Sequence, residues 1–101
     1  MDGKKVLEVI GIYRSYFETN RIGLINYPRH LIVSLRKNIL AHCHGMLDKM
    51  EEFVAEDRMG KAFRWLGFIQ GCLWATGCYT LEELKNHNRP SKLEMNRDDE
   101  I

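Results

Sequence analysis

The longest helical pattern in the sequence lies in residues 28–56, PRHLIVSLRKNILAHCHGMLDKMEEFVAE. Its apolar residues recur at steps of three and four, the period of one helical face. We call this apolar stripe the seam, and it consists of Ile32, Leu35, Ile39, Cys43, Met46, Met50 and Phe53. Pro28 suits the first position of a helix, where its missing N–H costs no hydrogen bond. The pattern predicts one helix over residues 28–56, about 40 Å long at ~1.5 Å per residue.

Three more helices are predicted around this one. Residues 3–19 place apolar side chains on one stripe, namely Val6, Ile10, Tyr13 and Phe17. A third helix is expected from Asp57, as N-cap, to Thr76, with Gly77 at its C-terminal end. Thr80 and Glu83 form a capping box that opens a short fourth helix, which ends near Pro90. The apolar loop 20–27 is expected to lie against the core.

Composition restricts the class of protein. The chain has 101 residues, 45% of them hydrophobic and 29% charged, with a net charge of +1. These values exclude wholesale disorder and a second domain, and they disfavour non-specific nucleic-acid binding. The three cysteines favour a reducing compartment, and the uncharged run 65–81 is shorter than a membrane span. We expect an all-α domain over residues 1–90, with a flexible polar tail over 91–101, in the cytoplasm.

The expected architecture is a helical hairpin or bundle of three main helices plus a short capped C-terminal helix. Gly67, Gly71 and Ala75 form a smooth stripe on the third helix, where another backbone could approach closely. About 90 ordered residues can hardly bury both the seam of the second helix and an almost wholly apolar third helix. The sequence therefore predicts a homo-oligomer, most simply a two-fold dimer.

Catalytic and metal-binding patterns are weak. His42 and His44 flank Cys43, but two residues apart on a helix they point about 200° apart and cannot share one ion. The acidic run 48–57 is similar to the carboxylate clusters of all-α nucleotide pyrophosphohydrolases, yet no second acidic motif accompanies it. No phosphate loop or nucleophile motif is present. We expect no enzyme, no metal site and no cofactor.

Charge is distributed unevenly along the predicted long helix. Residues 14–37 hold five basic residues and one acidic residue, whereas residues 48–57 hold five acidic residues and one lysine. One interpretation is a solvated face or ion pairs between antiparallel helices, with arginines near residues 29–36 facing Glu51, Glu52 and Glu56. The other is an anion- or partner-binding cluster at the helix N-terminus. Its candidate residues are Arg21, Arg29, Arg36 and Lys37.

Arg64 and Trp65 form a possible stacking site for a planar ring. The alternative is that Trp65, like Trp74, belongs to the hydrophobic core.

One segment resembles a known family. Residues 61–74, KAFRWLGFIQGCLW, continue through GCYTLEEL at 77–84 to NRP at 88–90, and LAHCH at 40–44 precedes MLD at 46–48. Over residues 38–90 the chain resembles small helical proteins of tailed bacteriophages that have no assigned activity. The resemblance implies a phage origin and expression in the bacterial cytoplasm, and it transfers no catalytic residue.

Two functions remain open. In the first, the chain binds and modulates a host or defence protein through a helical surface. In the second, an oligomer of the chain sequesters an anionic nucleotide, such as a cyclic nucleotide, that serves as a defence signal. Nucleotide binding would be detected by a thermal-shift screen, and a protein partner by capture from host lysate.

Overall fold

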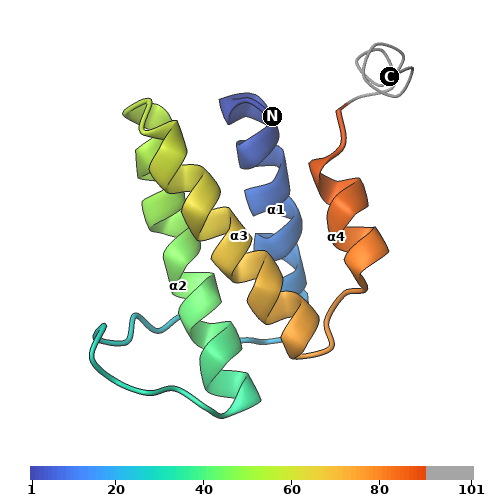
Figure 1. Cartoon of the computed structure of the whole chain (residues 1–101). Helices are drawn as coiled ribbons and strands as arrows, with labels where there is room; N and C mark the ends of the chain where they lie inside the picture. Colours follow the sequence, from blue (N-terminus) through green and yellow to red (C-terminus); the bar gives the residue numbers. More distant parts are fainter. Residues whose placement is uncertain (91–101) are drawn as a thin grey trace.

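The computed structural model describes residues 1–90, which form four α-helices and no strand. They are α1 (Gly3–Thr19), α2 (Arg36–Ala55), α3 (Met59–Ala75) and α4 (Leu81–Asn88). Successive helices run in opposite directions, with α3 in front of α1 and α2 and with α4 beside them (Figure 1). The all-α class with a short fourth helix is thus confirmed. The predicted tail, 91–101, lies outside the described residues.

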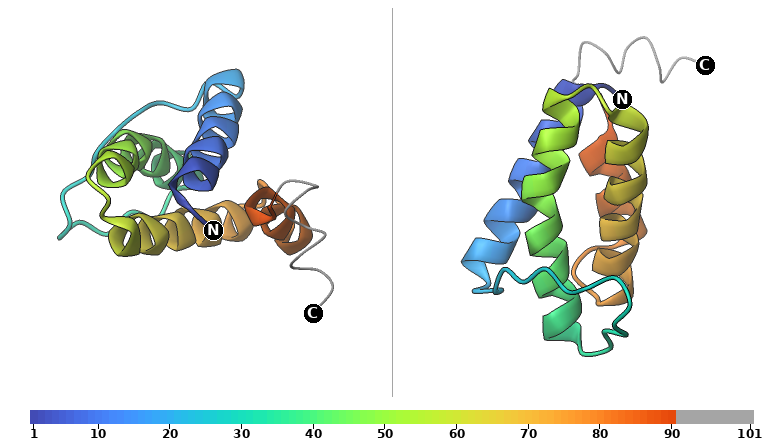
Figure 2. Two further views of the ribbon diagram at one scale, coloured as in Figure 1. Left: turned by 90° about the horizontal axis from the view of Figure 1, so that it is seen from above. Right: turned by 90° about the vertical axis from the view of Figure 1, so that its left-hand side faces the viewer.

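The core lies where three apolar stripes meet. In α1 the stripe is the predicted one, and Val6, Ile10, Tyr13 and Phe17 are fully buried or nearly so. The α2 helix packs against both α1 and α3, which explains why it buries more residues than any other helix. The right-hand view of Figure 2 shows α2 between α1 and α3. The predicted seam is therefore real from Cys43 to Phe53.

The expected start of the second helix at Pro28 is wrong. Residues 28–35 are neither helix nor strand, and α2 begins at Arg36. Ile32, a predicted seam residue, is 96% exposed, and Leu35 is exposed as well. The Arg36 guanidinium Nε donates to the Thr76 carbonyl at the end of α3 (2.9 Å), so a longer α2 would project beyond its neighbour. A helical apolar stripe is stable only where a facing surface buries it.

The first three helices end in the same way. Each is followed by a residue with a positive φ, Arg21 (55°), Asp57 (57°) or Gly77 (79°). The next amide in each case donates across the last turn, as from Cys78 N to Leu73 O (2.8 Å), which is a Schellman motif. Asp57 therefore terminates α2. The prediction that it caps α3 is wrong, because Arg58 holds that position and makes no side-chain cap.

The start of α4 is as predicted. The Thr80 hydroxyl accepts from the Glu83 amide (3.1 Å), and the Glu83 carboxylate accepts from the Thr80 amide (2.9 Å). This reciprocal pair is local in sequence, which is why the motif alone predicted it.

Candidate functional site

The segment over residues 20–35 connects α1 to α2 and runs along the side of α2 (Figure 2). The His44 ring Nδ1–H donates to the carbonyls of Ile22 (3.0 Å) and Gly23 (3.2 Å). The His42 ring Nδ1 accepts from the Tyr27 amide (3.1 Å). Both histidines thus hold the backbone of the segment against α2. The expectation that residues 20–27 lie against the core is met only in part, because Ile22 packs against the core whereas Leu24 and Ile25 are exposed.

Gly45 allows this close approach. A Cβ at this position would lie 2.6 Å from the Asn26 side-chain oxygen and 2.8 Å from the Ile25 carbonyl. Any side chain larger than hydrogen would therefore push the segment away from α2. Gly45 could not be recognised from the sequence, because a glycine within a helical pattern does not indicate that another backbone segment packs against it.

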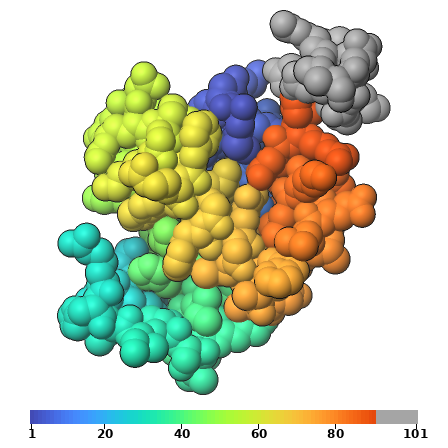
Figure 3. Space-filling model, viewed as in Figure 1, coloured from blue at the N-terminus to red at the C-terminus, as the bar shows by residue number. Residues whose placement is uncertain are grey.

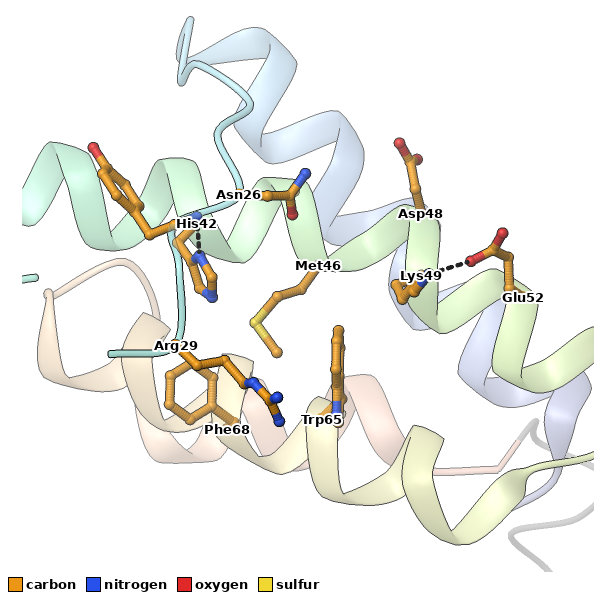
Figure 4. Close-up of a pocket in the computed structure, with 11 residues that line it drawn as sticks. Asn26, Arg29, His42, Met46, Asp48, Lys49, Glu52, Trp65 and Phe68 are labelled. Atoms are coloured by element: carbon orange, nitrogen blue, oxygen red, sulfur yellow. Dashed lines mark hydrogen bonds and ion pairs between the residues drawn. The ribbon is translucent and has the colours of Figure 1, made fainter. Parts of the chain in front are cut away.

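A cleft of about 650 Å³ opens between this segment, α2 and α3. Figure 4 shows Arg29 extending over Phe68 toward Trp65, with Met46 pointing down from α2 between them. His42 and Asn26 lie on the opposite side of the same cleft. Two residues that the sequence analysis placed in separate candidate sites, Arg29 and Trp65, therefore line one cavity.

The cleft has balanced charges. Its cations are Arg29 and Lys49, and its carboxylates are Asp48 and Glu52. Lys49 pairs with Glu52 (3.5 Å), whereas Arg29 makes no ion pair within residues 1–90. The cleft thus combines an aromatic wall with one available guanidinium, an arrangement that suits a planar molecule bearing an anionic group.

A second, more apolar hollow of about 550 Å³ adjoins the cleft. Pro28, Leu31 and Val33 line it from the segment, and Phe68 lines it from α3. Several large apolar side chains around it are exposed, and Phe68 itself is 55% exposed. We call Leu31, Ile32, Leu35 and Phe68 the loop surface.

The structure does not bring the predicted basic cluster together. Because α2 begins at Arg36, Arg29 and Arg36 do not share a helical face. Arg36 is engaged with the end of α3, where its Nη2 also contacts the Cys78 sulfur (3.5 Å). Lys37 is exposed on the first turn of α2, and Arg21 ends α1 in a left-handed conformation. Of the four candidates, only Arg29 lines a cavity.

Ion pairs do connect antiparallel helices, but through a different arginine. Arg14 of α1 pairs with Asp48 (3.0 Å) and with Glu51 of α2. Within residues 1–90, neither Arg29 nor Arg36 forms an ion pair with the α2 glutamates, and such pairing between two copies stays a prediction. Arg14 lies directly opposite because α1 and α2 pack side by side along their length.

The proposed stacking pair is divided between two sides of α3. Trp65 is half-buried, with its ring edge-on to Phe53 at a centroid distance of 4.9 Å. Arg64, one residue earlier, is exposed and does not line the cleft.

The small-residue stripe also differs from expectation. Added Cβ atoms at Gly67 and Gly71 would meet nothing within 4 Å. No helix among residues 1–90 therefore packs on the stripe at these two glycines. A contact with a second copy stays a prediction.

A polar cluster that the sequence analysis missed attaches α4 to the core. The Gln70 side-chain amide donates to the Tyr13 hydroxyl (2.9 Å) and to the Asn88 side-chain oxygen (2.8 Å), and Asn88 donates back to Gln70 (3.0 Å). The Tyr13 hydroxyl in turn lies 3.0 Å from His87 Nδ1 and donates its proton there. Burial raises the pKa of Tyr13 to about 12 and lowers the pKa of His87.

The cysteines are also closer together than their spacing indicates. Cys43 is buried, and its hydrogen bond with Cys72 raises the pKa of the Cys43 thiol and lowers that of Cys72 to about 7. None of the three is in a disulfide.

Within the part of the chain that the structure describes, no group of three His, Cys, Asp or Glu side chains is placed to hold a metal ion. No helix among residues 1–90 has the length and apolar character needed to cross a membrane. Comparison with protein-family models, with curated proteins and with solved structures finds no match in any of the three.

Proposed function

We propose that this chain is a non-enzymatic binding protein that engages a second protein through the loop surface. The observation that carries the proposal is Ile32, whose side chain is 96% exposed. Leu31 and Leu35 are exposed on the same segment, and Leu31 lines the apolar hollow together with Phe68 of α3. Clustered exposed apolar side chains mark interaction sites more often than chance placement does.

The charges near the loop surface define the complementary partner. Arg29 lies within the segment and Lys37 directly follows it, and neither makes an ion pair within residues 1–90. A partner with an apolar patch and an acidic rim would satisfy both features. If the resemblance to phage proteins reflects descent, this partner is a host or defence protein in the bacterial cytoplasm.

The test compares two changes of an exposed apolar residue to aspartate. Ile32→Asp places a charge on the loop surface, and Leu7→Asp places one on α1, where Leu7 is 45% exposed. Ile32→Asp should leave the free energy of unfolding within about 0.5 kcal/mol, because the Ile32 side chain is 96% exposed, and Leu7→Asp should cost more, so capture is compared at a temperature where both variants are folded. We expect a protein from bacterial lysate to be captured by the wild type and by Leu7→Asp and lost with Ile32→Asp. Identical capture by all three would contradict the proposal.

A second candidate function, sequestration of an anionic nucleotide, is favoured by one observation. Arg29 extends over the aromatic wall formed by Trp65 and Phe68 (Figure 4), so a base could stack while a phosphate pairs with the guanidinium. The Asp48 and Glu52 carboxylates line the same cleft and would repel a second phosphate group. For this reason nucleotide sequestration ranks below protein binding.

Cyclic and linear nucleotides test the second candidate directly. Binding should raise the melting temperature and quench Trp65 fluorescence, and Arg29→Ala should abolish both effects. Arg21→Ala is the matched control, since Arg21 is an exposed arginine that lines no cavity described here. If no nucleotide shifts the melting temperature, the sequestration function is wrong.

A further inference from the structure

The outer face of α3 is uncovered along its length, as the space-filling view shows (Figure 3). Residues Ala62, Leu66, Ile69 and Leu73 bury the opposite side of this helix. At 100° per residue, the outer face consists of Phe63, Arg64, Gly67, Phe68, Gly71, Trp74 and Ala75. All seven are exposed, with Phe68 at 55% and Trp74 at 54%.

The shape of this face suits a helix like itself. The open space at Gly67 and Gly71 forms a smooth strip, and the aromatic rings of Phe63 and Trp74 stand along one side of it. Nothing in the same chain requires glycine at either position. Small residues in register allow two helix backbones to approach closely, and the flanking aromatic rings then gain buried area.

The charges on this face determine the direction of pairing. Arg64 lies near the beginning of α3, and Glu82 follows its end, with no charged residue over 65–81. Neither residue makes an ion pair within residues 1–90. Trp74, Leu81 and Glu82 line a shallow hollow of about 550 Å³ beside the end of α3. An antiparallel pair brings opposite charges together twice, whereas a parallel pair would align like charges.

We propose that α3 pairs with α3 of a second copy in an antiparallel, two-fold dimer centred between Gly67 and Gly71. In this register Gly67 faces the partner's Gly71. The Arg64 guanidinium lies over the partner's Trp74 and pairs with the partner's Glu82, so that cation–π and ionic contacts occur at both ends. This dimer goes beyond the proposed function: it uses none of Leu31, Ile32 and Leu35, and only Phe68 borders both surfaces.

Light scattering tests the contact with a matched pair of glycines. Gly71 lies on the outer face of α3 and Gly11 on the exposed side of α1, and a Cβ has open space at both. We expect a wild-type mass of about twice 11.9 kDa. Gly71→Leu should give the monomer mass and Gly11→Leu the dimer mass, with helicity by circular dichroism unchanged in both. A wild-type monomer at every concentration, or a dimer that survives Gly71→Leu, overturns the proposal.

Charge reversal tests the antiparallel register. Arg64→Glu and Glu82→Arg should each weaken the dimer by about tenfold, measured as a rise in the dissociation constant. The double variant should restore the wild-type dissociation constant, because each reversed charge again faces its opposite. A double variant as weak as the single variants would show that Arg64 and Glu82 do not meet, and the register would be wrong.

Discussion

Two parts of the chain attach to the three-helix core from outside, and they do so by opposite means. Residues 77–90, with α4, are held by side chains: the amide pair of Gln70 and Asn88 and the contact of Tyr13 with His87. The segment 20–35 is held through its backbone, by His42, His44 and the amide of Ile25, which donates to the Ala41 carbonyl (3.1 Å). Polar α4 side chains thus turn inward, while apolar segment side chains turn outward.

The difference shows which part is available for binding. Apart from Ile22, which packs against the core, and Tyr27, which packs against His42, the segment is held through its backbone, so its exposed side chains can vary without loss of the fold. The side chains of α4 that face the core, in contrast, make the hydrogen bonds that hold this helix in place. Changes at α4 should therefore lower stability, whereas changes in the loop surface should affect binding alone. The four predictions below test this contrast.

The largest expected effect is at Gly45, the point of closest approach between the segment and α2. Gly45→Ala places a Cβ 2.8 Å from the Ile25 backbone carbonyl, which cannot move without displacing the segment. We expect a loss of about 2–3 kcal/mol in the free energy of unfolding, measured with urea. Gly11→Ala, also on a helix but with open space, should instead stabilise by about 0.5–1 kcal/mol. Equal effects would contradict the close contact.

Tyr13→Phe should have the next largest effect, because it removes the hydroxyl at the centre of the polar cluster. Gln70 and His87 each lose a partner in a partly buried site, which costs about 1–2 kcal/mol. Hydrogen exchange should quicken in α4 more than in α1. Tyr79→Phe is the control: its ring packs against Tyr13 and His87, but its hydroxyl makes no hydrogen bond within residues 1–90. Its stability should be close to that of the wild type.

Acid should weaken the attachment of α4 to the core. Burial holds the pKa of His87 below its ordinary value of 6.5, although Glu83 opposes this shift. The unfolded chain therefore binds the proton more readily, and the free energy of unfolding falls as the pH drops from 6.5 through the folded-state pKa. We expect a smaller loss than that of Tyr13→Phe. His87→Gln should remove this part of the pH dependence in urea unfolding at several pH values, and an unchanged profile would contradict the assignment.

The smallest effects concern the turns that lead into the two parts. Arg21 and Gly77 occupy equivalent left-handed positions after α1 and α3. Arg21→Gly should stabilise by about 0.5–1 kcal/mol, since glycine adopts a positive φ without strain, and Gly77→Ala should destabilise by about 1 kcal/mol. Thermal unfolding should separate the two by opposite shifts. Shifts of the same sign would show that backbone strain does not dominate at these turns.

The sequence alone determined the features that depend on neighbours along the chain. The α1 stripe, the Gly77 turn and the Thr80–Glu83 capping box were all predicted, and each is set within a few residues. The Cys43–Phe53 part of the seam was also predicted, because helix periodicity and burial agree there.

The start of α2 at Arg36, within a longer periodic pattern, depends on tertiary contacts. Ile32 and Leu35 satisfy the same spacing as Cys43 and Met46, but α3 ends beside Arg36 and leaves nothing to cover them. The same holds for the cleft, where Arg29 and Trp65 meet because Gly45 admits the segment against α2. Spacing specifies which face a side chain would occupy on a helix. Whether a second surface buries that face depends on parts of the chain far away in sequence.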